Sequence, residues 1–396
     1  MMNSAPLRLG ARTHRFTESV IREMTRLANR YDAINLAQGF PDFSCPEPLK
    51  LAACEAIMAN HNQYAPTWGD VGFRQAIAEK CQWYLGLSID PDRNITVTCG
   101  STEAMAATLQ AVLDPGDEVI LFEPFYENYG PDVILAGAVP RYVRMHPPHW
   151  SLDEAELRAA FNDKTRAIII NSPNNPTGKV YTAEELGLIA ELCQQWNVLA
   201  ITDEIYEHIT YDGREHLSLA TLPGMAARTV VINGLSKTYS VTGWRIGYVI
   251  APADITALIR KVHDYLAIAA PTPFQKAGVA AMQLPRSYYF ELGQLYREKR
   301  KRFLEILEAS GVRTLPPQGA YYVFADIGDF GYHTDVEFSN YLVKEVGVAA
   351  VPGSSFFRRA EEGHRFVRFC FSKTEATLEA AAERLGKLRQ TLRLAT

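Results

Sequence analysis

The residue best suited to covalent chemistry is Lys237, which lies in the sequence NGLSKTY directly after the apolar run TVVIN. Because a lysine at the end of a buried strand is partly desolvated, its pKa falls and its neutral amine can attack a carbonyl. The segment also resembles the end of a phosphate-binding P-loop, but the glycine that must stand directly before the lysine is absent. The sequence therefore predicts imine formation at Lys237, with an exposed loop lysine as the alternative.

A carboxylate and a phenol follow another apolar run, VLAIT, in the sequence DEIY at residues 203–206. The commonest role of an acid at a strand end is to cap the helix that follows. Asp203 can instead keep a heterocyclic nitrogen protonated, with the phenol of Tyr206 close behind it. The sequence is compatible with both roles.

Two further segments offer groups that bind anions or hydrogen-bond to a ring. SPNNPTG at residues 172–178 is a turn by composition, but it also carries paired amides, including Asn175, which a plain turn does not require. GSTE at residues 100–103 places the hydroxyls of Ser101 and Thr102 at a helix start, where free backbone N–H groups attract anions. Serine and threonine cap many helices, so this second segment is weak evidence alone.

Aromatic rings and an arginine complete the set. Tyr126 and Tyr129 follow the run EVILF, where a ring can cover a flat ligand or pack in the core. Arg368 alternates with apolar residues in FVRFCF, and an inward-facing arginine there needs a carboxylate, which its fork binds through two hydrogen bonds. Together the segments require a flat phosphorylated ring, an imine-forming lysine and a carboxylate clamp. Pyridoxal 5'-phosphate with an amino acid meets all of these requirements.

Alternating strands and helices must position these residues. Short runs rich in Ile and Val are separated by helical stretches such as residues 100–113 and 183–196, which predicts a mostly parallel sheet covered on both faces. Ligands bind at the carboxyl ends of the strands in such α/β sheets. We predict a large domain at residues 46–285 and a smaller α+β domain at residues 286–396. The N-terminal arm, residues 1–45, contributes part of the smaller domain.

Composition excludes several classes of protein. The net charge of -5 and the pI near 6.0 provide no basic field for nucleic acid or anionic lipid. Six scattered cysteines favour a reducing compartment, and no apolar run is long enough to span a membrane, so we expect a cytoplasmic enzyme. His146 and His149 lack further ligands nearby, so no metal site is predicted. Arg8, Arg12 and Arg15 precede no apolar core, which predicts a short disordered arm rather than a targeting signal.

The most specific signal is LSKTYSVTGWRIG at residues 235–247. With NNPTG and DEIY at matching spacing, the chain resembles the class I/II aminotransferases of fold type I. The resemblance is to the branch shared by kynurenine, glutamine and methionine transaminases and prokaryotic aspartate transaminases. It runs from NLAQGFPD at residues 35–42 to Arg368, nearly the whole chain. It implies a seven-stranded, mostly parallel sheet, a smaller α+β domain and pyridoxal phosphate as the cofactor.

The resemblance also implies roles for individual residues. Lys237 is expected to hold the cofactor covalently and to move a proton at the substrate, while Asp203 pairs with the ring nitrogen. Asn175 and Tyr206 are expected to hydrogen-bond to the phenolic oxygen of the ring. The ring is expected to stack on Tyr126. Ligands of the cofactor phosphate are expected at Gly100, Ser101, Thr102, Ser236 and Arg245.

Substrate binding and assembly follow from the same resemblance. Arg368 is expected to bind the substrate α-carboxylate, together with Asn175 and a backbone N–H of Gly39. Tyr64 matches a tyrosine that reaches the cofactor phosphate of the neighbouring subunit. A homodimer with shared active sites is therefore expected, without nucleic acid or membrane as a partner.

The reaction and its substrate stay partly open at this point. Transamination by a ping-pong mechanism is preferred, and a β-eliminating lyase on the same fold is the alternative, because both need Lys237 and Asp203. Aromatic, methionine- or glutamine-like, or aspartate-type amino acids are implied as substrates. Residues 268–272 are small and aliphatic where the kynurenine and glutamine branch carries rings. No second arginine for a dicarboxylate side chain stands out in the sequence.

Overall fold

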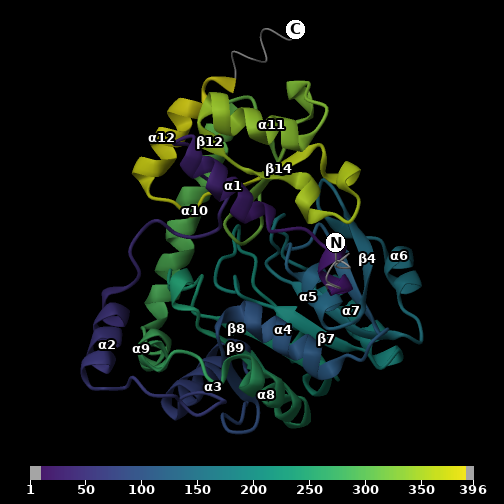
Figure 1. Cartoon of the computed structure of the whole chain (residues 1–396), viewed down its shortest axis with the longest axis vertical. Helices are drawn as coiled ribbons and strands as arrows, with labels where there is room; N and C mark the ends of the chain where they lie inside the picture. The colour runs from purple at the N-terminus through teal and green to yellow at the C-terminus, as the bar shows by residue number, and fades with distance from the viewer. Residues whose placement is uncertain (1–9, 389–396) are drawn as a thin grey trace, which may run out of the picture.

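The computed structural model describes residues 10–388, and a large sheet forms the lower half of the molecule in Figure 1. Its eight strands lie in the order β2-β9-β8-β7-β6-β3-β4-β5. Their bounds are β2 Ile95–Thr98, β3 Glu118–Glu123, β4 Val139–His146, β5 Ser151–Leu152, β6 Thr165–Asn171, β7 Leu199–Asp203, β8 Thr229–Gly234 and β9 Gly247–Ile250. β9 runs antiparallel to both neighbours and β5 runs antiparallel to β4, whereas the remaining pairs are parallel.

Helices cover both faces of this sheet. The helix bounds are α1 Val20–Arg30, α2 Glu47–Met58, α3 Val71–Leu85, α4 Gly100–Val112, α5 Tyr129–Leu135, α6 Glu154–Ala160, α7 Ala183–Gln195, α8 Ala253–Ala267, α9 Thr272–Met282, α10 Arg286–Ala309, α11 Asp335–Tyr341 and α12 Glu375–Leu385. Along β6, Ala167 and Ile169 pack with α4, α5 and α8, whereas Ile168 and Ile170 pack with α7. Since both faces of β6 are buried from Ala167 to Ile170, every position in that stretch is apolar, which explains the continuous run in the sequence.

A second, antiparallel sheet lies above the first in Figure 1, in the order β10-β11-β14-β13. Its strands are β10 Arg313–Thr314, β11 Tyr322–Asp326, β13 Val351–Pro352 and β14 Phe366–Cys370. β1, Ile34–Asn35, pairs in parallel with β12, Val348–Ala349, so the N-terminal segment is tied to the C-terminal part of the chain. The long helix α10 runs between the regions of the two sheets (Figure 1). The domain limits at residues 46–285 and 286–396 stay a prediction.

Two details of the sheets differ from the expectation. The large sheet has eight strands rather than seven, because the two-residue β5 adds to its edge beside β4. The apolar run VAAV at residues 348–351 predicts a single strand, but it is divided between β12 and β13, which belong to different sheets. Short apolar runs do not reveal such breaks, because burial is the same on both sides of them.

The prediction of a disordered N-terminal arm is wrong for the part of the arm that the structure describes. Residues Ala11–Arg15 form a 3-10 helix, and Arg12 donates a hydrogen bond to the Leu135 carbonyl (3.1 Å), which holds this segment on α5. Arg8 lies outside the described residues. Among residues 10–388, no helix is both long and apolar enough to cross a bilayer.

Candidate active site

A cavity of about 430 Å³ lies between the carboxyl ends of β3, β6, β7 and β8 and the smaller sheet. Most of the predicted site residues line it: Gly39, Ser101, Thr102, Tyr126, Asn175, Asp203, Tyr206, Ser236, Lys237, Arg245 and Arg368. Gly100 and Tyr64 do not, and Tyr64 is 78% exposed on the outside of the chain. Neighbouring parallel strands thus bring residues from distant parts of the sequence to one edge, as predicted.

The amine of Lys237 is surrounded by backbone and aromatic rings. Its Nζ donates to the carbonyl of Gly39 (2.9 Å) and lies 5.8 and 5.6 Å from the ring centres of Tyr206 and Tyr321. Burial disfavours the charged ammonium and lowers the pKa of Lys237 to about 8. Near neutral pH a larger share of this lysine is therefore a neutral amine than for a lysine in water.

The carboxylate of Asp203 borders the same cavity at the end of β7. Its Oδ2 accepts a hydrogen bond from the Tyr129 hydroxyl (2.7 Å), and its Oδ1 accepts one from the Ile205 N–H (3.2 Å). Burial raises the pKa of Asp203, and both hydrogen bonds oppose that shift because they favour the anion. A protonated nitrogen in the cavity would stabilise the anion further.

Arg368 is fully buried on β14 and has no carboxylate partner among the described residues. Its guanidinium donates to the Asn175 side-chain oxygen (2.7 Å) and the Ala37 carbonyl (2.6 Å), and lies 4.3 Å from the ring centre of Tyr322. Within the described residues its Nε has no hydrogen-bond partner. A buried cation held only by neutral acceptors is costly, so the site favours an anionic ligand.

Tyrosine hydroxyls and amides hold the groups around Arg368 in place. The hydroxyls of Tyr206 and Tyr322 are 2.9 Å apart, and both side chains are buried. The backbone N–H of Asn175 donates to the side-chain oxygen of Asn171 (2.7 Å), whose amide donates to the Asp203 carbonyl (3.0 Å). These contacts connect the ends of β6 and β7, so the loop after β6 keeps one position.

Hydroxyls and a guanidinium line the part of the cavity at the start of α4. Ser101 and Thr102 lie in the first turn of α4, where backbone N–H groups lack helical partners. A Cβ added to Gly100 would lie 2.4 Å from the guanidinium of Arg245, and the φ of Gly100 is +84°, so only glycine fits there. Gly100 therefore shapes this part of the cavity without lining it, whereas Ser236 lines it directly.

Some lining residues carry no clear signal in the sequence. They are Ser19, Ile21, Arg22, Gln38, Met105, Asn128, Asp132, Asn171 and Tyr322. Burial raises the pKa of Asp132 to about 7, and its Oδ2 has no partner among residues 10–388. Asn171 could have been found as the last polar residue of a buried strand, but Asp132 looks like any acid on a helix.

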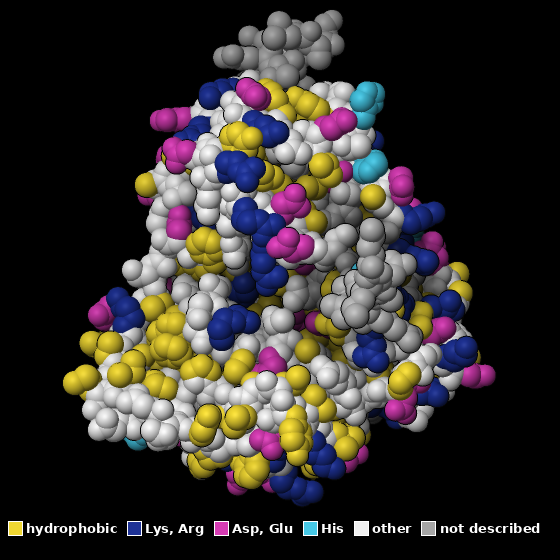
Figure 2. All heavy atoms as spheres, viewed as in Figure 1, with side chains coloured by type: hydrophobic (Ala, Val, Ile, Leu, Met, Phe, Trp, Pro, Cys, Tyr) yellow, Lys and Arg dark blue, Asp and Glu magenta, His cyan; other side chains and the backbone are white. Residues whose placement is uncertain are grey.

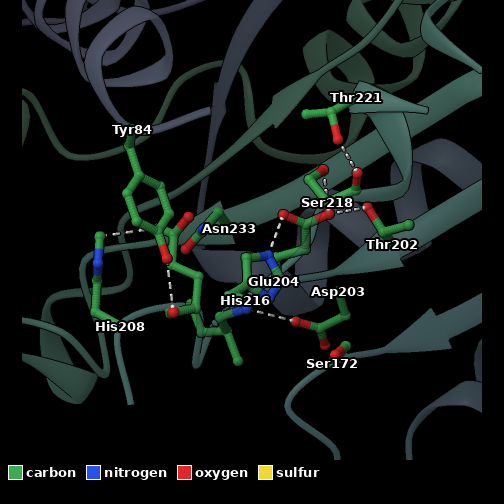
Figure 3. Close-up of polar contacts among 12 residues, drawn as sticks. Tyr84, Ser172, Thr202, Asp203, Glu204, His208, His216, Ser218, Thr221 and Asn233 are labelled. Atoms are coloured by element: carbon green, nitrogen blue, oxygen red, sulfur yellow. Dashed lines mark hydrogen bonds and ion pairs between the residues drawn. The ribbon is translucent and has the colours of Figure 1, made fainter. Parts of the chain in front are cut away.

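Behind the cavity, Glu204 belongs to a separate buried network (Figure 3). One carboxylate oxygen accepts hydrogen bonds from the hydroxyls of Thr202 (2.8 Å) and Ser218 (2.7 Å). The other lies 2.8 Å from Nε2 of His216. Burial acts to lower the pKa of His216, but the adjoining carboxylate more than offsets this and leaves the pKa above its usual value.

In the same network, three residues of the kinds that bind metal ions lie close together. Glu204, Glu207 and His216 place one ligand atom each within 4.8 Å of one another. Glu207, however, forms a buried ion pair with Lys80, and the oxygens of Glu204 accept the contacts above. Protein donors thus satisfy both carboxylates, and the two basic side chains balance their charge.

Comparisons with known proteins agree with this geometry. The family model for "Aminotransferase class I and II" matches residues 31–385. The chain is 38% identical to the methionine aminotransferase of Escherichia coli K12 over 98% of this chain and all of that protein. It is 37% identical to human kynurenine–oxoglutarate transaminase 1 over 92% of this chain and 94% of that protein.

A solved structure gives the same result. The N-succinyldiaminopimelate aminotransferase of Mycobacterium tuberculosis superposes with a TM-score of 0.94 at 40% identity, over 96% of this chain and all of that one. These relatives are named as transaminases, which supports amino-group transfer and not the lyase alternative. The chain belongs to the class I and II aminotransferase family, with the fold type I architecture.

Proposed function

We propose that the cavity binds pyridoxal 5'-phosphate and that the enzyme moves an amino group between an L-amino acid and a 2-oxo acid in a ping-pong cycle. The observation that carries the proposal is the shared cavity of Lys237 and Asp203, one an amine with a lowered pKa and the other a buried carboxylate. When bound, the cofactor supplies an aldehyde for the amine and an electron-accepting ring. The residues present fit both demands.

The donor set also fits the rest of the cofactor. Ser101, Thr102, Ser236 and Arg245 offer hydroxyls and a guanidinium for the phosphate, with the N-terminus of α4 beside them. Asn175 and Tyr206 are proposed to donate to the phenolic oxygen of the ring, and Tyr126 to stack on its face. Asp203 is proposed to keep the ring nitrogen protonated, which its hydrogen bond from Tyr129 supports by favouring the anion.

Lys237 is proposed to act first as the covalent anchor and then, once the amino substrate has replaced it, as the base. Its neutral Nζ would accept the proton from the substrate Cα and would then deliver it to the cofactor carbon on the other side of the transferred nitrogen. The lowered pKa suits both steps, because the amine exchanges a proton near neutral pH. The Gly39 carbonyl, 2.9 Å from Nζ, fixes the position from which the amine works.

Arg368 is proposed to bind the substrate α-carboxylate through two hydrogen bonds, with the N–H of Gly39 as a further donor. The unpartnered Nε and the absence of a carboxylate partner among the described residues support this assignment. The ring of Tyr322, 4.3 Å from the guanidinium, limits the directions that it can take. Amino acids without the α-carboxylate should therefore be poor substrates.

We also propose a homodimer, because apolar side chains gather on one side of the single chain. Tyr265 is 92% exposed and Tyr64 is 78% exposed. The segment carrying Tyr64 lies against α8, since Thr67 donates to Asp264 (3.2 Å). Figure 2 shows further hydrophobic side chains over the lower part of the molecule, around α2 and α9. Exposed patches of this kind mark protein interfaces.

For the substrates we propose a range of amino acids, and for the compartment the cytoplasm. Relatives named for methionine, kynurenine and aspartate suggest neutral, aromatic or acidic amino donors. Six free cysteines and the lack of a membrane-spanning helix within residues 10–388 are compatible with a cytoplasmic enzyme. A panel of amino acids tested against a few 2-oxo acids would identify the preferred pair.

The test of the proposed function is Lys237→Ala, with Lys164→Ala at an exposed loop position as the matched control. The purified wild type should show the absorbance band of lysine-bound cofactor and should convert a 2-oxo acid to its amino acid without releasing ammonia. Lys237→Ala should lose both the band and multiple turnover, whereas Lys164→Ala should keep both. Turnover that survives in Lys237→Ala would remove this lysine from the mechanism.

A further inference from the structure

An arginine that the sequence did not single out lies at the mouth of the active-site cavity. Arg22 is in the first turn of α1, and it lines the cavity together with Ser19 and Ile21. The backbone N–H of Arg22 donates to the hydroxyl of Ser19 (3.3 Å), which caps the helix. The start of α1 therefore forms part of the cavity wall. Figure 2 shows basic side chains along the position of α1.

The start of α1 is held in place by Glu127, which follows the proposed ring-stacking residue Tyr126. The Ser19 hydroxyl donates to one carboxylate oxygen of Glu127, and the Ile21 N–H donates to the other (3.4 Å). Both oxygens of this acid therefore already have protein donors. Because Glu127 itself lines the cavity, its contacts fix α1 beside the space where a substrate would lie.

The guanidinium of Arg22, in contrast, makes no hydrogen bond or ion pair with any other residue in the part of the chain that the structure describes. Glu18, a carboxylate on which the charge of Arg22 acts, already pairs with Arg26 through contacts of 2.8 and 3.1 Å. The Arg22 guanidinium is therefore a cation whose hydrogen-bond donors are free to bind a ligand at the mouth of the cavity. Arg368, which is buried and proposed to hold the α-carboxylate, lines the same cavity.

We propose that Arg22 is a specificity-determining residue that binds an anionic group at the far end of the substrate side chain. This inference rests on the proposed function and deepens it: the enzyme would favour dicarboxylic amino and 2-oxo acids over neutral ones of similar length. Arg368 takes the α-carboxylate and Arg22 takes the distal carboxylate. An exposed arginine–carboxylate pair is worth up to about fivefold in affinity and weakens with salt.

The test uses the holoenzyme and two unreactive ligands, glutarate with two carboxylates and butyrate with one. Calorimetry gives the dissociation constant of each for the wild type, for Arg22→Gln and for Arg30→Gln. Arg30 is the matched control, an arginine at the end of α1 that does not line the cavity. Arg22→Gln should reduce the preference for glutarate over butyrate by up to about fivefold, and Arg30→Gln should leave it unchanged.

Kinetics provide a second reading of the same proposal. In Arg22→Gln the KM for glutamate should rise with little change in kcat, and added salt should reduce the wild-type preference for glutamate over methionine. An unchanged preference for glutarate in Arg22→Gln, or an equal loss for glutarate and butyrate, overturns the proposal. Neither result depends on turnover, so both stay distinct from failure of the proposed function, which would appear as a wild type that transfers no amino group.

Discussion

Asp203 and Glu204 are neighbouring buried acids at the end of β7, yet their surroundings differ. Glu204 accepts contacts from two hydroxyls and one imidazole in a closed network. Asp203 accepts two hydrogen bonds and borders a cavity that a ligand can enter. Burial alone therefore does not distinguish a candidate catalytic acid from a structural one. The distinguishing feature is acceptor capacity that the protein leaves open toward a cavity.

The largest expected difference comes from removing each acid in turn. Asp203→Ala should lower kcat at least about a hundredfold, because a preorganised charge at the reacting ring is lost, with the cofactor still bound. Glu204→Ala should instead destabilise the fold by about 3–5 kcal/mol, because a buried basic group and two hydroxyls lose their acceptor. Steady-state kinetics and urea unfolding measure the two effects. Equal losses of kcat in both variants would contradict the comparison.

The two buried lysines extend the comparison to stability against pH. In the cofactor-free protein the pKa of Lys237 is about 8 when folded and 10.5 when unfolded, so the unfolded chain binds more protons between these values. Stability should therefore rise with pH across that window, by up to about 3 kcal/mol, and Lys237→Met should remove this rise. Unfolding at several pH values measures it.

Lys80 is also buried, but its pKa is shifted in the opposite direction from that of Lys237. Burial alone would lower the pKa of Lys80, but its ion pair with Glu207 more than offsets this and leaves the pKa raised. Lys80→Met should consequently leave the rise between pH 8 and 10.5 in place. If Lys237→Met keeps the rise instead, the Lys237 amine is not desolvated in the way that its surroundings indicate.

Two buried arginines differ in whether an acidic side chain of the protein pairs with them. Arg368 lacks an acidic partner among the described residues, whereas Arg74 pairs with Asp92 at 2.6 Å. Arg368→Gln should raise the KM for α-carboxylate substrates about tenfold to a hundredfold, since charge-assisted hydrogen bonds are lost. Arg74→Gln should lower the melting temperature and leave KM close to that of the wild type. A KM that is unchanged in Arg368→Gln would place the carboxylate clamp elsewhere.

The smallest effect is expected from the hydroxyl that holds Asp203. Tyr129→Phe removes a hydrogen bond that lowers the pKa of Asp203, so that pKa should rise. The acid limb of the kcat profile should move to higher pH, with less than about a tenfold loss at its maximum. Ser218→Ala, which removes one donor to Glu204, should leave the profile in place. A profile unaffected by Tyr129→Phe would show that this hydrogen bond does not tune the acid.

The sequence predicted the parts of the molecule that are encoded locally. Lys237, Asp203 and Asn175 each follow a short apolar run, and the carboxyl ends of parallel strands meet at one edge, so their convergence could be inferred. Arg22 and Asp132 could not be found in this way. Each is an ordinary charged residue on a helix, and only the packing of that helix against the sheet gives it a place at the cavity.

Glu204 is the opposite case, a residue that stands out in the sequence but does not line the cavity. In the sequence it is as prominent as Asp203, since both belong to DEIY, and only alternation along the strand end sends the two side chains to different surroundings. Its partner His216 lies in a loop without regular structure, so their contact depends on tertiary packing. The division between β12 and β13 was hidden for a similar reason, because both strands are equally buried.

The most direct test of the central claim is to locate the covalent bond between the cofactor and the chain. Borohydride treatment of the cofactor-loaded enzyme, followed by digestion and mass spectrometry, should place the reduced cofactor on Lys237 and on no other lysine. The yellow colour should disappear as the modified peptide forms. Modification of a different lysine, or full activity after treatment with Lys237 unmodified, would contradict the account.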